Sequence, residues 1–230
     1  MEIDLKELNF ELEKILTEVR YDRSLLFEEV VQLNRIAKGL KTEFGQYSRN
    51  DKQNSLILKN PNSGSFANIG GDRTAVDVEF PKSYEDFKSL SVKTVESVVK
   101  HLEVDEFNRV GVRFLFAQRC NSLDEASSVI KGNFLDLNNM FMSEKITAPK
   151  VYFVVNNKGN KINVSLRVEP VTAIRVGPSY QEEVQEAVIL FDIDVYQQNN
   201  LQPNNINDFL DNSKEDALDL LKSLRDKMSR

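Results

Sequence analysis

The hydrophobic and polar positions of the chain follow two different periods, which together predict a mixture of strands and helices. A period of two over residues 74–80 and 110–116 is typical of strands that bury one face. A spacing of three and four residues follows Ser83 as far as Leu102, which predicts a helix with Ser83 as its N-cap. The chain therefore alternates between sheet-forming and helix-forming segments.

The same two patterns predict further elements in both halves of the chain. In the first half these are a strand or amphipathic lead-in over 10–21, a helix capped by Ser24 and reaching residue 40, and strands over 55–59 and 66–69. In the second half they are a helix capped by Asn121 or Ser122, a hairpin of residues 151–155 and 162–168, a strand over 187–196, and a closing helix after a polar linker at 200–205. Two insertions are expected in the second half, near 136–148 and 170–186, with a loop at Gly177-Pro178.

One arrangement of strand and helix occurs twice. The strand at 76–80 precedes a helix that carries Asp86-Phe87, and the strand at 191–196 precedes a helix that carries Asp208-Phe209. From these Asp-Phe pairs onward the helical matches keep one offset of about 122 positions, as an internal repeat would. The order of elements therefore predicts a duplicated unit.

These elements predict an α+β protein. Two related β-α-β(3–4)-α halves, residues 1–104 and 105–230, are expected to form one extended, mostly antiparallel curved sheet with helices on one side. The sheet is expected to be mostly antiparallel because hairpin turns join the central strands. The two halves are expected to share this sheet and to form one compact unit.

Composition narrows the classes of function. The chain has 230 residues, a net charge of -6 and 29% charged residues of both signs, which is typical of a soluble surface and unlike the basic stripe of a nucleic-acid binder. The single Cys120 allows no intrachain disulfide, and the single His101 cannot by itself build a His-based metal site. Residues 1–10 lack the apolar stretch of a signal peptide, and we find no apolar run of membrane-spanning length. We therefore expect a cytoplasmic location and no membrane association.

The candidate binding residues lie on two predicted strands. Arg109, Gly111 and Arg113 share one strand face, and so do Asp192 and Asp194 on another. An Arg–Asp ladder across the sheet would account for both patterns without a ligand. Alternatively, the gap at Gly111 between two guanidinium groups could admit a carboxylate or phosphate.

Two catalytic alternatives use the acidic residues and the single cysteine. Asp192 and Asp194, with Glu169, could hold a divalent metal for a phosphodiesterase or nuclease. Arg119 could lower the pKa of the neighbouring Cys120 thiol and make it a nucleophile, although a buried structural cysteine is the ordinary interpretation. His101 is expected to complement the dipole at a helix C-terminus.

Two resemblances bear on the fold. The segments Asn108 to Phe114 and Leu190 to Tyr196, with the turn Pro61 to Gly64, resemble a sporadically distributed family of uncharacterised prokaryotic proteins of similar length. That family brings no established activity or ligand. The duplicated order of elements is similar to the topology of the TATA-binding protein, whose concave sheet face bends DNA. The comparable strands here carry acids that repel phosphate, so we expect no nucleic-acid partner. These acids are Asp77, Glu79, Asp192 and Asp194.

The function that these observations favour is that of a binding or interaction protein rather than an enzyme. The chain contains no glycine-rich phosphate loop, no Gly-x-Ser-x-Gly nucleophile elbow and no paired cysteines. We expect no cofactor, and we expect a protein partner or self-association through the open face or edge of the sheet. The alternatives are the metal-dependent enzyme and a pocket for a small apolar ligand built from the 14 phenylalanines.

Overall fold

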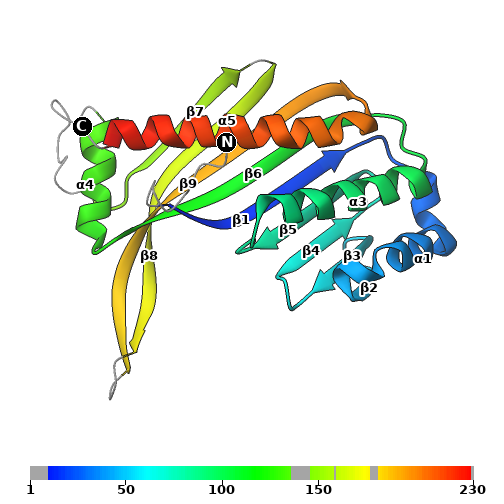
Figure 1. Cartoon of the computed structure of the whole chain (residues 1–230), viewed down its shortest axis with the longest axis horizontal. Coiled ribbons are helices and arrows are strands. Elements are labelled where there is room, and N and C mark those ends of the chain that lie inside the picture. The colour runs from blue at the N-terminus through cyan, green and yellow to red at the C-terminus, as the bar shows by residue number, and fades with distance from the viewer. Residues whose placement is uncertain (1–9, 136–145, 158, 177–180, 229–230) are drawn as a thin grey trace.

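The computed structural model describes residues 10–135, 146–157, 159–176 and 181–228 (Figure 1). The strands of this part are, in chain order, β1 (Glu11–Arg20), β2 (Gln46–Asn50), β3 (Ser55–Asn60), β4 (Ser65–Ile69), β5 (Arg73–Glu79), β6 (Phe107–Cys120), β7 (Lys150–Asn157), β8 (Asn160–Val176) and β9 (Gln181–Leu201). They form one nine-stranded antiparallel sheet in the order β2-β3-β4-β5-β1-β6-β9-β8-β7.

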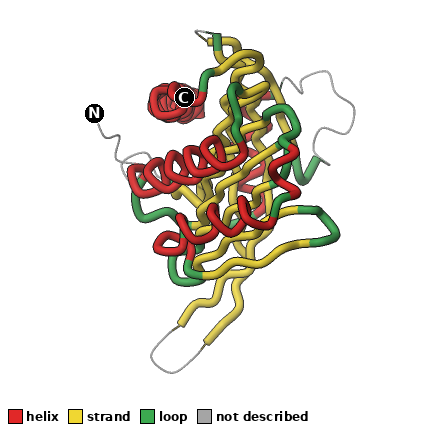
Figure 2. The backbone as a smooth tube through the Cα atoms, turned by 90° about the vertical axis from the view of Figure 1, so that its right-hand side faces the viewer, coloured by secondary structure: helices red, strands yellow, loops and turns green. Residues whose placement is uncertain are grey.

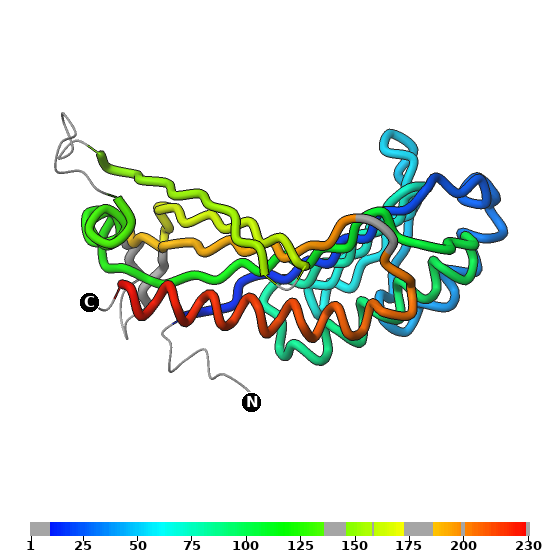
Figure 3. The backbone as a smooth tube through the Cα atoms, turned by 90° about the horizontal axis from the view of Figure 1, so that it is seen from above, coloured from blue at the N-terminus to red at the C-terminus, as the bar shows by residue number. Residues whose placement is uncertain are grey.

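The helices of the described residues occur in both halves of the chain, residues 1–104 and 105–230. They are the 3-10 helix η1 (Leu25–Glu28), α1 (Val30–Gly39), α2 (Lys41–Phe44), α3 (Tyr84–Leu102), α4 (Leu123–Phe134), the 3-10 helix η3 (Pro203–Asn205) and α5 (Ile206–Met228). The two long helices α3 and α5 lie on one face of the sheet (Figure 2). The sheet curves away from them, so that its open face is concave (Figure 3).

The core lies between the sheet and the helices. On β6 the side chains at 110, 112, 114 and 116 are buried, as the period of two predicts, and they belong to one core cluster with side chains of every helix from α1 to α5. The opposite face of β6 carries Arg109, Gly111 and Arg113 and faces away from the helices. The predicted α+β class and the extended antiparallel sheet are therefore confirmed.

The two central strands organise the strand order. β1 and β6 pair with each other along most of their length, with Thr17 opposite Val112. On one side of this pair β5 lies next to β1, and on the other side β9 lies next to β6. β5 and β9 are each followed by a long helix, α3 and α5 respectively. The concave face near the middle of the sheet is consequently built from both halves of the chain, with β5 and β1 from the first and β6 and β9 from the second.

Two N-caps follow the sequence prediction and one does not. The Ser83 hydroxyl accepts a hydrogen bond from the Asp86 amide at the start of α3, and Ser122 accepts one from Glu125 at the start of α4. Ser24 makes no such bond, because its hydroxyl instead donates to the Leu102 carbonyl. The expected single helix after Ser24 is also interrupted, since η1 ends before α1 begins at Val30.

The strands depart from the prediction in two places. β2 is an additional edge strand whose side chains are mostly exposed and polar, so no alternation of apolar residues marks it. Much of the insertion expected near 170–186 is strand, because β8 and β9 stay paired from Val171 opposite Glu186 to Val176 opposite Gln181. This hairpin extends beyond the body of the sheet (Figures 1 and 2). The expected loop at Gly177-Pro178 and most of the expected insertion at 136–148 lie outside the described residues.

Candidate functional site on the open face

Arg109 lies flat over Gly111 on the open face of the sheet. A side-chain carbon at position 111 would lie only 3.1 Å from Nη1 of Arg109, so glycine is what lets the guanidinium approach the strand. The same guanidinium lies 4.7 Å from the ring centroid of Tyr196, which is opposite Gly111 on β9. The gap at Gly111, which the sequence suggested could admit an anion, is thus filled by the Arg109 side chain.

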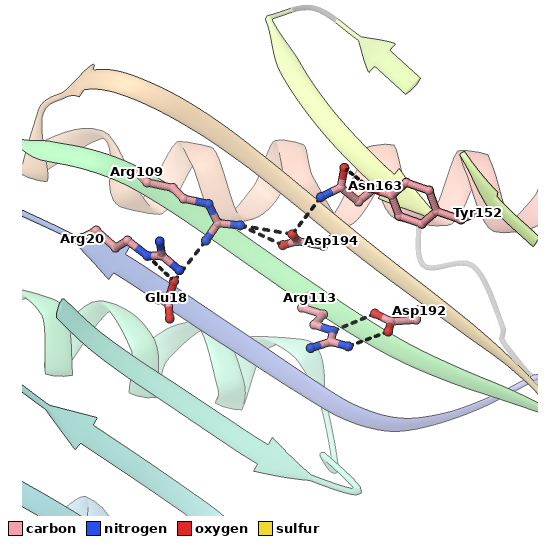
Figure 4. Close-up of polar contacts among 8 residues, drawn as sticks. All are labelled: Glu18, Arg20, Arg109, Arg113, Tyr152, Asn163, Asp192 and Asp194. Carbon is pink, nitrogen blue, oxygen red and sulfur yellow. Dashed lines mark hydrogen bonds and ion pairs between the residues drawn. The ribbon is translucent and has the colours of Figure 1, made fainter. Parts of the chain in front are cut away.

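A continuous chain of polar contacts crosses five strands through Arg109 (Figure 4). The guanidinium donates to Glu18 on β1 at 3.1 Å and to Asp194 on β9 at 3.1 Å. Asn163 on β8 donates to Asp194 at 3.4 Å, and the Tyr152 hydroxyl on β7 donates to Asn163 at 3.1 Å. These contacts hold side chains from β1, β6, β9, β8 and β7 in one network.

A second rung of ion pairs lies beside this first one on the same face of the sheet, and it is formed by Arg113 on β6, Asp192 on β9 and Arg167 on β8. Arg113 donates to both oxygens of Asp192, at 2.7 Å from Nε and 2.5 Å from Nη2. Arg167 on β8 donates to Asp192 at 3.2 Å and to Glu169 at 2.6 Å. The predicted Arg–Asp ladder is therefore present, with the bidentate geometry that makes arginine–carboxylate pairs strong.

The two rungs differ in how far water reaches them. The side chains of Arg109 and Asp194 are 18% and 23% exposed, whereas that of Arg113 is 49% exposed above a nearly buried Asp192. Burial raises the pKa of Asp194, and the attraction of Arg109 only partly opposes this. The hydrogen bond to Asp192 raises the pKa of Arg113.

Both rungs border one hollow of about 630 Å³ on the concave face, here termed the central hollow. It is lined by Leu16, Glu18, Arg20, Arg109, Gly111, Arg113, Lys150, Tyr152, Asn163, Ser165, Arg167, Asp192 and Asp194. Five of these side chains are cationic and three are carboxylates, so the hollow is locally basic although the whole chain carries a net charge of -6.

The carboxylates that the sequence suggested as ligands of a divalent metal are each paired with an arginine. Both oxygens of Asp192 accept from Arg113, those of Asp194 accept from Arg109, and Glu169 accepts from Arg167. Across the part of the chain that the structure describes, no group of three or more His, Cys, Asp and Glu side chains is arranged to hold a metal ion. A metal at Asp192 would first have to displace the Arg113 guanidinium.

Cys120 and His101 lie away from the central hollow. The thiol is buried in the core, and burial raises its pKa to about 11, so the suggestion that Arg119 lowers this pKa is wrong. Arg119 instead pairs with Glu11 on the open face at 3.0 Å. His101 lies in the last turn of α3, as expected, and its pKa is lowered by burial and by nearby Lys100 and Arg35.

Sequence patterns did not identify several residues of the network. Glu18, Tyr152, Asn163 and Arg167 come from three strands other than β6 and β9. Period two in each strand places them on a face, but it does not say which strand lies next to which. The strand order supplied the missing information.

No protein-family model matches the chain, and no curated protein matches it in sequence. The resemblance to the prokaryotic family therefore stays a prediction. Within the described residues, none of the helices combines the length and apolar character that crossing a membrane requires.

Proposed function

We propose that the chain is a binding protein and that the concave open face, around the central hollow, is where a protein partner docks. The observation that carries this proposal is the five-strand network on the face of the sheet that none of the described helices covers (Figure 2). Side chains already held by ion pairs lose little conformational freedom when a partner arrives. Arginine and tyrosine are also the side chains that most often dominate binding energy at interfaces.

Two exposed side chains are the expected contact points. Arg113 is half exposed although it is fixed by Asp192, and Tyr152 is 60% exposed at the far end of the network. A rigid guanidinium and an aromatic ring on one concave surface supply both a polar and an apolar contact to a partner.

The origin of the fold is a related proposal. We infer that the two halves derive from one duplicated unit with the topology of the TATA-binding protein, and that the chain belongs to the prokaryotic family that it resembles. The order of strands around β1 and β6 supports the first inference. The carboxylates among the cations of the concave face argue against the DNA binding that this topology serves elsewhere. A cytoplasmic location is proposed from the sequence alone.

The other candidate functions have less support. The metal-dependent enzyme needs Asp192 and Asp194 free, and both are paired with arginines. An apolar-ligand pocket needs phenylalanines around a cavity, whereas Phe10 and Phe191 pack edge to face in the core and Phe114 stacks on Phe116.

The test is a pull-down from the native host with identification by mass spectrometry. The bait is compared with a double variant, Arg113→Ala with Tyr152→Ala, and with Lys222→Ala, which changes an exposed residue of α5. We expect a partner that the wild type and Lys222→Ala retain and that the double variant loses. A partner retained equally by all three would contradict the proposal, and recovery of the chain itself would indicate self-association.

A further inference from the structure

The floor of the central hollow contains a hydroxyl group without a partner. Ser165 on β8 is 9% exposed, and its buried Oγ makes no hydrogen bond to any of the residues that the structure describes. Its direct neighbours across the sheet are Tyr152 on β7 and Asp192 on β9. A buried hydroxyl without a hydrogen bond is costly, and such groups in a folded protein usually have a partner.

Three cationic side chains surround this hydroxyl on the open face. Arg167 is two residues further along β8, Lys150 lies opposite Arg167 on β7, and Arg113 reaches in from β6 to Asp192. Lys150 is exposed and forms no ion pair with any described residue. Arg113 uses Nε and Nη2 for Asp192, and Arg167 uses Nε and Nη1. Each guanidinium therefore keeps one terminal nitrogen that donates no hydrogen bond to the described residues.

The charges around Ser165 fit one compact anion. Three cations face two carboxylates, Asp192 and Glu169, which leaves one positive charge unbalanced. A polyanion such as a nucleic acid would bring further phosphates toward Asp194 and Glu18 on the same face, where they would be repelled. A single oxyanion at Ser165 avoids this repulsion.

We propose that Ser165, Lys150, Arg113 and Arg167 form a binding site for one oxyanionic group, a carboxylate or a phosphate. This inference rests on the proposed function, since it names the group that a ligand or partner presents to the open face. The Ser165 hydroxyl donates to one oxygen of the anion, and the free nitrogens of Lys150 and the two arginines donate to the others. The Ser165 Oγ is itself buried, so binding requires its neighbour Tyr152, which is 60% exposed, to change rotamer and open the floor of the hollow.

The test measures binding of inorganic phosphate and of succinate by calorimetry at fixed ionic strength. The variants are Ser165→Ala and Lys150→Gln, with Lys222→Gln as a matched control on the helix-covered side of the molecule. We expect saturable binding that weakens at least about tenfold in each site variant and does not change in the control. Phosphate binding alone would identify a phosphate ligand, and succinate binding alone a carboxylate.

Several outcomes would overturn the site. These are no saturable binding to the wild type, equal binding by all variants, or binding of a single-stranded oligonucleotide that is lost in Lys150→Gln. Melting curves of each variant establish that it is folded. If neither anion binds but the partner is still lost in the Arg113→Ala, Tyr152→Ala double variant, only this inference fails. If the anions bind as expected and no partner depends on the open face, only the protein-partner proposal fails.

Discussion

Gly111 and Arg109 act as one unit on the open face. The glycine leaves space that the guanidinium fills, and the guanidinium then lies within reach of Glu18, Asp194 and Tyr196. Glycine in a strand interior normally weakens the strand, since it increases the freedom of the unfolded chain. The cost at position 111 is therefore offset by the contacts of a neighbouring side chain.

This coupling predicts how Gly111→Ala behaves in two backgrounds. In Arg109→Ala the substitution should stabilise the protein by about 0.4–1 kcal/mol, because alanine restricts the unfolded chain and the guanidinium no longer occupies the space above it. In the wild type the new methyl group displaces the guanidinium, so the gain should disappear or change sign. Urea denaturation of the four proteins should give a coupling energy of about 1–2 kcal/mol. Equal effects in both backgrounds would show that the space is not shared.

Cys120 provides a second prediction at the residue scale. Burial raises its pKa to about 11, so at pH 8 the folded thiol is almost entirely protonated. Alkylation by iodoacetamide should then be on the order of 100-fold slower in the native than in the urea-unfolded protein. The raised pKa also means that the stability contributed by the neutral thiol is present below about pH 8.5 and is lost as the pH rises toward 11. Equal labelling rates in the folded and unfolded protein at pH 8 would contradict the buried position.

At the scale of elements, α5 fixes the turn between β7 and β8. The nearly buried carboxylate of Asp216 accepts hydrogen bonds from Asn157 and Asn160, both at 2.7 Å. These two asparagines are opposite each other at the end of the hairpin. One helix side chain therefore anchors the strands that carry Tyr152, Asn163 and Ser165.

Removing that anchor should loosen the hairpin. We expect Asp216→Ala to lower the free energy of unfolding by about 2–3 kcal/mol, because the buried amide of Asn160 and the half-buried amide of Asn157 lose their acceptor. Hydrogen exchange should accelerate in β7 and β8 before it does in β1 and β6. Asp219→Ala, which changes an exposed residue of the same helix, is the control and should have an effect close to zero. Unchanged protection in β7 would mean that the strand pairing alone holds the hairpin.

At the scale of the molecule, the two segments of the chain share both the sheet and the helix layer. β1 pairs with β6 from Val19 opposite Val110 to Ile15 opposite Phe114. On the other face, α3 and α5 are joined by the Lys88–Asp211 ion pair at 2.7 Å. The buried side chains of both segments belong to one core cluster.

A shared core predicts cooperative unfolding. Although the chain is longer than most two-state domains, differential scanning calorimetry should give one transition, with the calorimetric enthalpy equal to the van't Hoff enthalpy. Neither segment can unfold without exposing an edge of the central β1–β6 pair and the apolar surface beneath it. Two resolved transitions would show that residues 1–104 and 105–230 are independent domains.

Local patterns in the sequence determined which segments form elements and which face each element buries. The hydroxyls of Ser83 and Ser122 cap helices because the amides that they bind are only three residues away. Alternation placed Arg109, Gly111 and Arg113 on one face for the same reason, since side-chain direction in a strand depends on the strand alone. β2 has no such pattern, because a polar edge strand buries too little to require one.

Only the tertiary structure decided which side chains meet. Arg113 and Asp192 are 79 residues apart, and Arg109 and Glu18 are 91 apart, so their contacts depend on strand order and register. Register is set by how the buried faces of neighbouring strands pack together, and a slip of one residue would turn every side chain to the opposite face. The ladder was therefore predictable as a pairing of residue types. The central hollow, with its unpartnered Ser165 and the cations around it, arises only when five strands lie side by side.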